Sequence, residues 1–281
     1  MRIAILIPSR NRPRLLLAAI TALHEMESGE NEVEYRVGYD PDDNATRECV
    51  LGLPNTFFIP TDDDTLTIGG IWNNLAKRYS DADIYSCMID DAFPITPHWD
   101  KEMVRMAGLY EAFSWYECSA PKNIGYPTCT KAWFDKVGYI GQDFWPYWFY
   151  DSSFAELVQF VTNKPVPISH QLALFSKQEA TQNLRQLDHW WGFFNATRPV
   201  RVAEAYRIVK PDMTLEEFTN SRLRWIALGE ARDAEFRGTK IAAIESARAV
   251  GEPSARYLAA FKRSEEYLAT NGLKLWQGVE P

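Results

Sequence analysis

Residues 2–13 read Arg-Ile-Ala-Ile-Leu-Ile-Pro-Ser-Arg-Asn-Arg-Pro, and this stretch predicts the kind of fold. The apolar run from Ile3 to Ile7 is rich in β-branched residues, and Pro8 with the polar residues after it ends the run. We therefore expect a short buried strand over residues 2–8. From Pro13 to Met26 the apolar residues recur at helical spacing, so a helix should follow directly. A buried strand that passes at once into a helix is the first half of a strand–helix–strand unit.

The same alternation continues through the N-terminal half of the chain. Strands are expected over residues 33–39, 56–59 and 83–89, and a helix over residues 68–79. This order predicts an α/β domain with a mainly parallel central sheet flanked by helices. In such sheets, ligands bind off the carboxyl ends of the strands.

Polar residues gather at three of these predicted strand ends. Ser-Arg-Asn follows the first strand at residues 9–11, Asp-Pro-Asp-Asp follows the second at 40–43, and Asp90-Asp91 follows the fourth. Because the carboxyl ends of parallel strands meet at one edge of a sheet, we expect these groups to lie together there. A further acidic run, residues 62–64, precedes a helix that Thr67 can cap, and we expect a solvated loop there.

The C-terminal part of the chain is expected to be helical. Residues 113–170 are less regular and rich in aromatics, and residues 177–195 have a helical pattern. From Met213 onward the sequence predicts consecutive helices, the first capped by Thr214 with Glu217 three residues later. We therefore expect one domain over residues 1–200 and a helical extension over residues 201–281. The extension is a candidate cover for the acceptor side of a site, or a candidate contact between copies in a homo-oligomer.

The composition of the 281 residues is that of an ordinary globular protein, with 46% hydrophobic and 24% charged residues. The formal net charge is −8, which argues against nonspecific binding to a nucleic-acid backbone. The four cysteines have no zinc-ligand spacing, and no apolar run is long enough for a signal peptide or a transmembrane helix. We expect a cytoplasmic protein with buried free thiols. The motifs of Rossmann dinucleotide sites, P-loops and α/β-hydrolases are absent.

Five ordered pieces of the sequence carry a resemblance to a known family: Ile5-Leu-Ile-Pro-Ser-Arg-Asn-Arg-Pro13, Tyr39-Asp-Pro-Asp-Asp43, Gly69-Gly-Ile-Trp-Asn-Asn74, Met88-Ile-Asp-Asp-Ala-Phe-Pro94 and Tyr150-Asp-Ser-Ser-Phe-Ala-Glu156. This series resembles the nucleotide-sugar-dependent glycosyltransferases of the GT-A fold, particularly family 2. The resemblance covers about residues 1–195. It implies transfer of a sugar from a UDP- or GDP-type donor, with inversion by direct displacement and the help of Mn²⁺ or Mg²⁺.

The acidic pair after the fourth strand is the candidate metal site. Departure of a nucleoside diphosphate is favoured by a divalent cation on its phosphates, and oxygen ligands hold such a cation. The resemblance implies Asp91 on the metal and Asp90 toward the ribose or a metal-bound water. A turn or a helix cap is the competing interpretation of the pair. His170 matches a further metal ligand that many GT-A enzymes take from a later segment, although a lone histidine is more often structural.

The resemblance also assigns the nucleotide pocket. Asp40 matches the acid that binds the base, and Pro8 and Arg10 match residues that line the same pocket. An Asx-turn is the competing interpretation of Asp40. For Asp42 and Asp43, the turn and the nucleotide-pocket interpretations are about equally good.

Asp151 is the candidate catalytic base, because it matches an acidic position of the family and opens a predicted helix; its competing role is a helix N-cap. The aromatic residues 144–150 directly before it, together with Trp190 and Trp191, are either core or a platform for sugar or acceptor.

The predicted function is therefore metal-dependent glycosyl transfer from a nucleotide-sugar donor. The acceptor stays open among glycans, lipid-linked sugars, proteins and modified nucleic-acid bases. Two alternatives share the fold class: a nucleotidyltransferase, which lacks its usual glycine-rich phosphate loop here, and a non-catalytic protein that binds nucleotides or sugars.

Overall fold

The computed structural model describes residues 1–49, 51–61, 67–78, 81–118, 124–145, 149–176, 187–246 and 255–275. The chain forms two compact units, each built from two segments. Unit 1 comprises Met1–Asp143 and Val166–Glu179, and unit 2 comprises Phe144–Pro165 and Ala180–Pro281. Unit 2 thus takes in residues 144–165 from the middle of the chain. The boundary at residue 200 that the sequence suggests stays a prediction.

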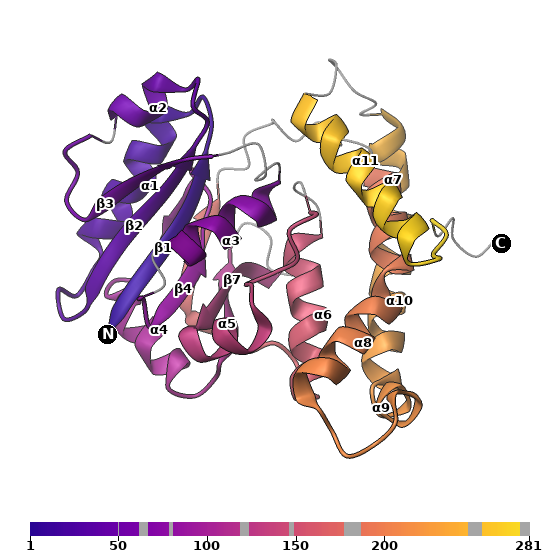
Figure 1. Ribbon diagram of the computed structural model, residues 1–281. Coiled ribbons are helices and arrows are strands. Elements are labelled where there is room, and N and C mark those ends of the chain that lie inside the picture. Colours follow the sequence, from indigo (N-terminus) through magenta and orange to yellow (C-terminus); the bar gives the residue numbers. More distant parts are fainter. Residues whose placement is uncertain are drawn as a thin grey trace. The chain divides into compact units, whose positions relative to one another are not determined.

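Unit 1 contains an eight-stranded mixed sheet (Figure 1) with the strand order β3-β2-β1-β4-β7-β6-β8-β5. Its strands are β1 (Arg2–Ser9), β2 (Glu32–Tyr39), β3 (Thr56–Pro60), β4 (Ile84–Cys87), β5 (Ala92–Pro94), β6 (Ala112–Glu117), β7 (Ile124–Thr130) and β8 (Ile168–Ser176). The first four strands are parallel to one another, as are β6 and β8. The pairs β4–β7, β6–β7 and β5–β8 are antiparallel.

The helices of unit 1 follow the predicted alternation, and their bounds are α1 (Pro13–Glu25), α2 (Asn44–Cys49), α3 (Ile68–Arg78), α4 (Trp99–Ala107) and α5 (Lys131–Val137). The predicted strands at 2–8, 33–39, 56–59 and 83–89 and the predicted helices at 13–26 and 68–79 are confirmed to within a few residues. The short helix α2 over residues 44–49 was not predicted from the sequence. The irregular region contains β6, β7 and β8.

The two faces of β1 pack against different helices because successive side chains of a strand point to opposite faces. Ile3, Ile5 and Ile7 lie in one buried cluster with apolar residues of α1 and α4. On the other face, α3 lies very close to Gly38 of the neighbouring strand β2, which pairs with Pro8 of β1. A Cβ atom on Gly38 would be only 2.6 Å from Cγ2 of Ile71 in α3. The sheet is therefore covered by helices on both faces, which explains why its central strands are continuous apolar runs.

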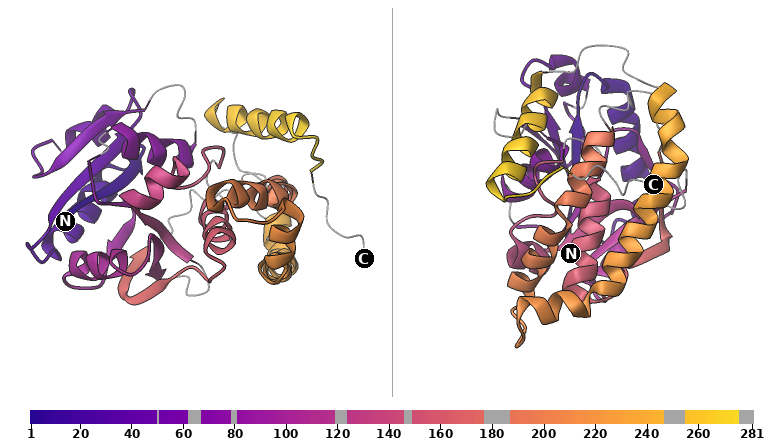
Figure 2. Two further views of the ribbon diagram at one scale, coloured as in Figure 1. Left: turned by 60° about the horizontal axis from the view of Figure 1, so that its bottom comes forward. Right: turned by 90° about the vertical axis from the view of Figure 1, so that its right-hand side faces the viewer.

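Unit 2 is entirely helical in the part of the chain that the structure describes (Figure 2). Its helices are α6 (Tyr150–Thr162), α7 (Leu187–Ala196), α8 (Arg198–Val209), α9 (Leu215–Ser221), α10 (Leu223–Ser246) and α11 (Ala255–Thr270). The predicted capping box is present at α9, where Thr214 and Glu217 exchange hydrogen bonds. Phe218 and Trp225 of this region are buried, whereas Leu215 is exposed.

An aromatic core holds α7 and α11 together. Trp190 and Phe193 of α7 are fully buried, and His189 beside them lies 4.0 Å from Phe261 between ring centroids. The His189 Nε2 atom is 2.9 Å from Oγ of Ser264, whose hydroxyl donates to the carbonyl of Phe261. The Ser264 oxygen must therefore accept from His189, so Nε2 carries the proton. Burial lowers the pKa of His189 to about 4, which keeps the ring neutral near pH 7.

All four cysteines are free; Cys87 and Cys129 are buried, and Cys49 and Cys118 are half-buried. Across the described residues, every helix is too short or too polar to cross a membrane.

Candidate functional site

The carboxyl ends of β1 and β4 are joined directly. The hydroxyl of Ser9 donates to Oδ2 of Asp90 at 2.7 Å. Behind this contact, Nε1 of Trp72 in α3 donates to the carbonyls of Leu6 and Met88, at 3.0 and 3.1 Å. The buried indole of Trp72 thus links β1, at Leu6, to Met88, which directly follows β4. The predicted meeting of strand ends is present between β1 and β4.

Asp90 and Asp91 are both buried, and a guanidinium bridges them. Nη1 of Arg12 lies 3.2 Å from Oδ1 of Asp90 and 3.3 Å from Oδ2 of Asp91. Burial raises the pKa of Asp90, and the charge of Asp91 raises it too, against the lowering effects of Ser9 and Arg12. Asp90 and Asp91 are a buried, mutually repelling pair that needs positive charge beside it.

Asp40 lies at the end of β2 and is also buried. Its Oδ1 accepts from the hydroxyl of Thr61 at 2.8 Å, and its Oδ2 is paired with Nη1 of Arg10. Arg10 is half-exposed and also reaches Asp42 at 3.5 Å. Pro8 is half-buried at the end of β1 and pairs in register with Gly38. Pro8, Arg10 and Asp40, the three residues assigned to the nucleotide pocket, therefore lie at neighbouring strand ends.

Asp43 has a structural role. It accepts from the backbone N–H of Thr46 and so caps α2, and it also accepts from the backbone N–H of Asn11 at 2.6 Å. Asn11 has φ of +56°, a left-handed conformation that asparagine tolerates better than most residues. Burial raises the pKa of Asp43, but its hydrogen bonds lower it by more, so the net shift is downward. Asp43 thereby fixes the loop that carries Arg10 and Arg12. The acidic run at 62–64 lies outside the described residues.

The side chains at the carboxyl ends of β1, β2 and β4 are negatively charged overall, so this region can bind an anion only together with a cation. Five acidic and two basic side chains meet here, a formal charge of −3: Asp40, Asp42, Asp43, Asp90, Asp91, Arg10 and Arg12. Buried carboxylates are costly unless they are paired or hold a metal. A bare diphosphate would be repelled by them.

The Asp90–Asp91 pair is suited to a divalent cation that is also coordinated by a phosphate ligand. Mg²⁺ and similar cations are commonly held by one or two carboxylates together with phosphate oxygens and water. No group of three His, Cys, Asp or Glu side chains that could hold a metal occurs among the residues that the structure describes. Asp90 and Asp91 therefore fit a cation that shares its coordination with a phosphate ligand, and they do not form a closed site made of protein alone.

The structure does not bring His170 to this pair. Ala92, next to Asp91, pairs with Ser176 at one end of β8, whereas His170 lies near the other end of that strand. Its ring is exposed and contacts Tyr116, with 4.3 Å between centroids.

Asp151 belongs to unit 2 and lies in the first turn of α6. The N-cap position is occupied by Phe149, so Asp151 is not the N-cap; its Oδ1 accepts from the N–H of Ser152 at 2.7 Å. Burial raises its pKa, although Ser152 and the charge of Arg232 lower it. Phe149 has φ of +66°, unusual for a bulky residue and typical of positions held by function. A half-buried carboxylate with a raised pKa is a suitable proton acceptor.

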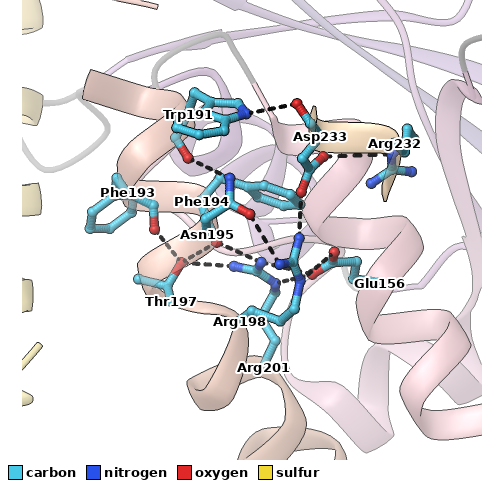
Figure 3. A network of polar contacts seen from close by, with 10 residues as sticks. All are labelled: Glu156, Trp191, Phe193, Phe194, Asn195, Thr197, Arg198, Arg201, Arg232 and Asp233. Atoms are coloured by element: carbon cyan, nitrogen blue, oxygen red, sulfur yellow. Dashed lines mark hydrogen bonds and ion pairs between the residues drawn. The ribbon is translucent and has the colours of Figure 1, made fainter. Parts of the chain in front are cut away.

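A buried ionic network anchors the helix that carries Asp151 (Figure 3). Glu156 of α6 accepts from Arg201 Nε at 2.9 Å and Nη2 at 2.7 Å, and from Arg198 Nε at 3.0 Å. Arg198 also pairs with Asp233 of α10. Two buried cations and two buried anions from three helices thus neutralise one another, and the more exposed Arg232 lies 3.7 Å from Asp233 as a third cation. A Cβ on Gly229 would lie 2.8 Å from Oε1 of Glu156, so α10 can approach only because this residue is glycine.

Of the two interpretations of the aromatic residues 144–150, core packing is the one that fits the residues that the structure describes. Phe144, Trp145, Phe149 and Tyr150 are buried, and Trp145 packs against Trp190 and Phe194. Trp190 and Trp191 are buried as well. These rings form the core of unit 2, and residues 146–148 lie outside the described part of the chain.

Sequence reasoning missed three residues of the site. Arg12, Thr61 and Trp72 contact partners 79, 21 and 66 residues away, and nothing in their local sequence announces these contacts. The only signal for Arg12 was its place in the polar exit of β1.

No protein-family model and no curated protein sequence matches this chain. Solved structures do match it. The mannosyltransferase PcManGT from Pyrobaculum calidifontis, in complex with GDP-Man and Mn²⁺, aligns over 96% of this chain and 86% of its own, with a TM-score of 0.52 and 13% identity. Residues 1–349 of TarS from S. aureus align in two complexes. The complex with UDP-GlcNAc has a TM-score of 0.56 and 10% identity, covering 100% and 98% of the two chains. The complex with UDP has a TM-score of 0.54 and 11% identity, covering 80% and 72%. The chain therefore has the GT-A fold of nucleotide-sugar glycosyltransferases.

Proposed function

We propose that this protein is a glycosyltransferase that moves a sugar from a nucleoside-diphosphate donor to an acceptor hydroxyl. The observation that carries the proposal is the gathering of Asp40, Asp90 and Asp91 at the carboxyl ends of parallel strands in a GT-A fold. The fold neighbours are complexes with GDP-Man and UDP-GlcNAc, which are donors of this class, and with UDP, the nucleoside diphosphate that such a donor leaves behind. The resemblance in sequence to family 2 supports the same class.

Recognition of the base falls to Asp40, Arg10 and Pro8. Asp40 already accepts from Thr61 and Arg10, yet a carboxylate has about four acceptor sites, so it can also accept an N–H of a pyrimidine or a guanine. Pro8 and the half-exposed Arg10 provide the adjoining wall.

The divalent cation, Mn²⁺ or Mg²⁺, would bind at the Asp90–Asp91 pair. We assign Asp91 to the metal and Asp90 to the ribose or a metal-bound water, as the resemblance implies. When bound, the cation supplies neutralisation of the charge that develops on the departing diphosphate. Ser9 holds Asp90 in place from the end of β1 through its hydroxyl. Because the contacts of His170 lie elsewhere, this proposal gives it no role at the metal.

Asp151 is the proposed base. In direct displacement, the acceptor hydroxyl loses its proton as it attacks the anomeric carbon, and the product has the inverted configuration. Burial raises the pKa of Asp151 toward the range in which a carboxylate accepts a proton efficiently at neutral pH. The buried network at Glu156 keeps α6 rigid and so keeps Asp151 in one orientation.

The experiment is a thermal-shift screen of UDP- and GDP-sugars with and without Mn²⁺, followed by a donor-hydrolysis assay. A ligand at one hundred times its Kd stabilises the protein by about 2.7 kcal/mol, so the correct donor should stand out. Asp91→Asn should remove the Mn²⁺-dependent shift. Asp135→Asn is the matched control, because it removes the same charge from a side chain of α5 that is 58% exposed and pairs with Lys131 rather than with a residue of the site.

Three outcomes would contradict the proposal. If no nucleotide sugar stabilises the protein, the donor class is wrong. If the protein instead forms a nucleotide sugar from a nucleoside triphosphate and a sugar 1-phosphate, with release of pyrophosphate, it is a nucleotidyltransferase. If the donor binds but is neither transferred nor hydrolysed under any condition, the protein is a non-catalytic binder.

A further inference from the structure

We propose that Arg12 is the counter-ion of the Asp90–Asp91 pair when no cation is bound and contacts the donor diphosphate when one is. This inference rests on the proposed function and adds to it a residue that neither the sequence motifs nor the fold likeness assigns. Arg12 should therefore weaken the binding of Mn²⁺ alone and strengthen the binding of the nucleotide.

The contact geometry is that of a replaceable partner. Nη1 of Arg12 alone makes both contacts, at 3.2 and 3.3 Å from the two carboxylates. Strong pairs of arginine with a carboxylate use two parallel N–H groups at about 2.7–2.9 Å. The bridge at Asp90 and Asp91 therefore neutralises the pair without the fork geometry of a permanent ion pair. In unit 2, by contrast, Arg201 donates two N–H groups, Nε and Nη2, to one oxygen of Glu156 at the shorter distances of 2.9 and 2.7 Å.

The position of Arg12 lets the guanidinium move while its backbone stays fixed. Arg12 directly precedes α1, with Pro13 at the first helical position, and Asn11 before it is held by Asp43. Its side chain is 19% exposed, against 7% and 4% for Asp90 and Asp91. The guanidinium therefore lies on the solvent side of the carboxylates, where a cation or a phosphate would arrive.

The charges determine the direction of the exchange. A divalent cation at the Asp90–Asp91 pair would bring two positive charges, against the single charge of the Arg12 guanidinium. It would therefore take over the neutralisation of the pair and repel the guanidinium. In the proposed reaction, the nearest new anion is the diphosphate on that cation. The planar guanidinium is well suited to phosphate oxygens, so Arg12 can stabilise the charge of the leaving group.

Three variants test this by isothermal titration. Arg12→Gln removes the charge, Arg12→Lys keeps the charge without the fork, and Arg14→Ala is the matched control. Arg14 is exposed in the first turn of α1, two residues from Arg12. Each protein is titrated with MnCl₂ alone, and then with UDP and with GDP in saturating Mn²⁺. Thermal melting checks that every variant folds.

We expect Arg12→Gln to bind Mn²⁺ alone about tenfold more tightly, because the competing cation is gone, and UDP or GDP about tenfold more weakly; hydrogen bonds to charged groups are worth about this much. Arg12→Lys should bind Mn²⁺ like the wild type and nucleotide several-fold more weakly. Arg14→Ala should change neither.

Unchanged or weaker Mn²⁺ binding in Arg12→Gln would overturn the counter-ion role, and unchanged nucleotide binding in both Arg12 variants would overturn the diphosphate contact. If Arg12→Gln does not fold, the nucleotide titration of Arg12→Lys decides the diphosphate contact. Tighter binding of Mn²⁺ by Arg12→Lys than by the wild type would then overturn the counter-ion role, because the lysine keeps the positive charge. A wild-type protein that binds Mn²⁺ but neither nucleotide refutes the proposed function itself, while the titration with Mn²⁺ alone still decides the role of Arg12 as counter-ion.

Discussion

Replacing Glu156 by glutamine should destabilise the protein strongly although the two side chains have nearly the same shape. Glu156 accepts three hydrogen bonds, one from Arg198 and two from Arg201, and all three side chains are buried. Glutamine keeps one acceptor oxygen and turns an N–H₂ group toward N–H donors. Arg198 would keep its ion pair with Asp233, whereas Arg201 would lose the carboxylate to which it donates.

The magnitude follows from the charge that is left without a partner. Breaking a buried ion pair by removing one partner costs about 3–5 kcal/mol, because the other charge stays buried. For a chain of this size, each kcal/mol lowers Tm by about 2–4 °C, so Glu156→Gln should lower Tm by roughly 10 °C. We expect kcat to fall as well, because Glu156 and the proposed base Asp151 lie on the same helix.

Urea unfolding followed by circular dichroism measures the change in the free energy of unfolding. Glu230→Gln is the matched control, since Glu230 is exposed on α10 and its replacement should be neutral. The double variant Glu156→Gln/Arg201→Met should recover part of the loss, because it removes the stranded charge. If Glu156→Gln unfolds within about 0.5 kcal/mol of the wild type, as surface substitutions do, the network is not what holds α6.

Three further predictions address the base, the helix packing and the response to pH. Asp151→Asn should keep Tm and donor binding but lose kcat by a factor on the order of 10²–10⁴, measured by steady-state transfer; near-normal kcat would move the role of base to Asp143. Gly229→Ala should cost about 1–3 kcal/mol in urea unfolding, because its Cβ would lie 2.8 Å from Glu156, whereas Gly108→Ala, whose Cβ would meet its nearest neighbour at 3.5 Å, should be nearly neutral. His189 has a folded pKa of about 4 and an ordinary value of 6.5, so the unfolded chain binds the extra proton between these values. Its contribution is intact above pH 6.5 and should fall by about 3 kcal/mol as the pH drops to 4. His189→Gln should flatten that slope in unfolding curves recorded across this range; an unchanged slope would contradict the assignment.

Much of unit 1 was predictable because its signals are local. A strand covered on both faces is a continuous apolar run, and a helix repeats its apolar residues every three to four positions, so β1, β2, α1 and α3 could be found within windows of about ten residues. The acidic groups at the strand ends were visible for the same reason. The strands β6 and β8 were not predicted; their pairing shifts register between Trp115 and Tyr116, and this irregularity arises only where the two strands meet.

The contacts that turn these groups into a site depend on tertiary structure. Arg12 and Asp90 are 78 residues apart and meet only because β1 and β4 are parallel neighbours whose carboxyl ends share one edge of the sheet. Glu156 can be buried only because Arg198 and Arg201 reach it from another helix, 42 and 45 residues later. The sequence by itself determined which segments become strands and helices and where acidic groups end them, since those signals depend on near neighbours. Only the tertiary structure decided which charges neutralise one another, because the electrostatic energy of a buried charge depends on distance in space and not on separation along the chain.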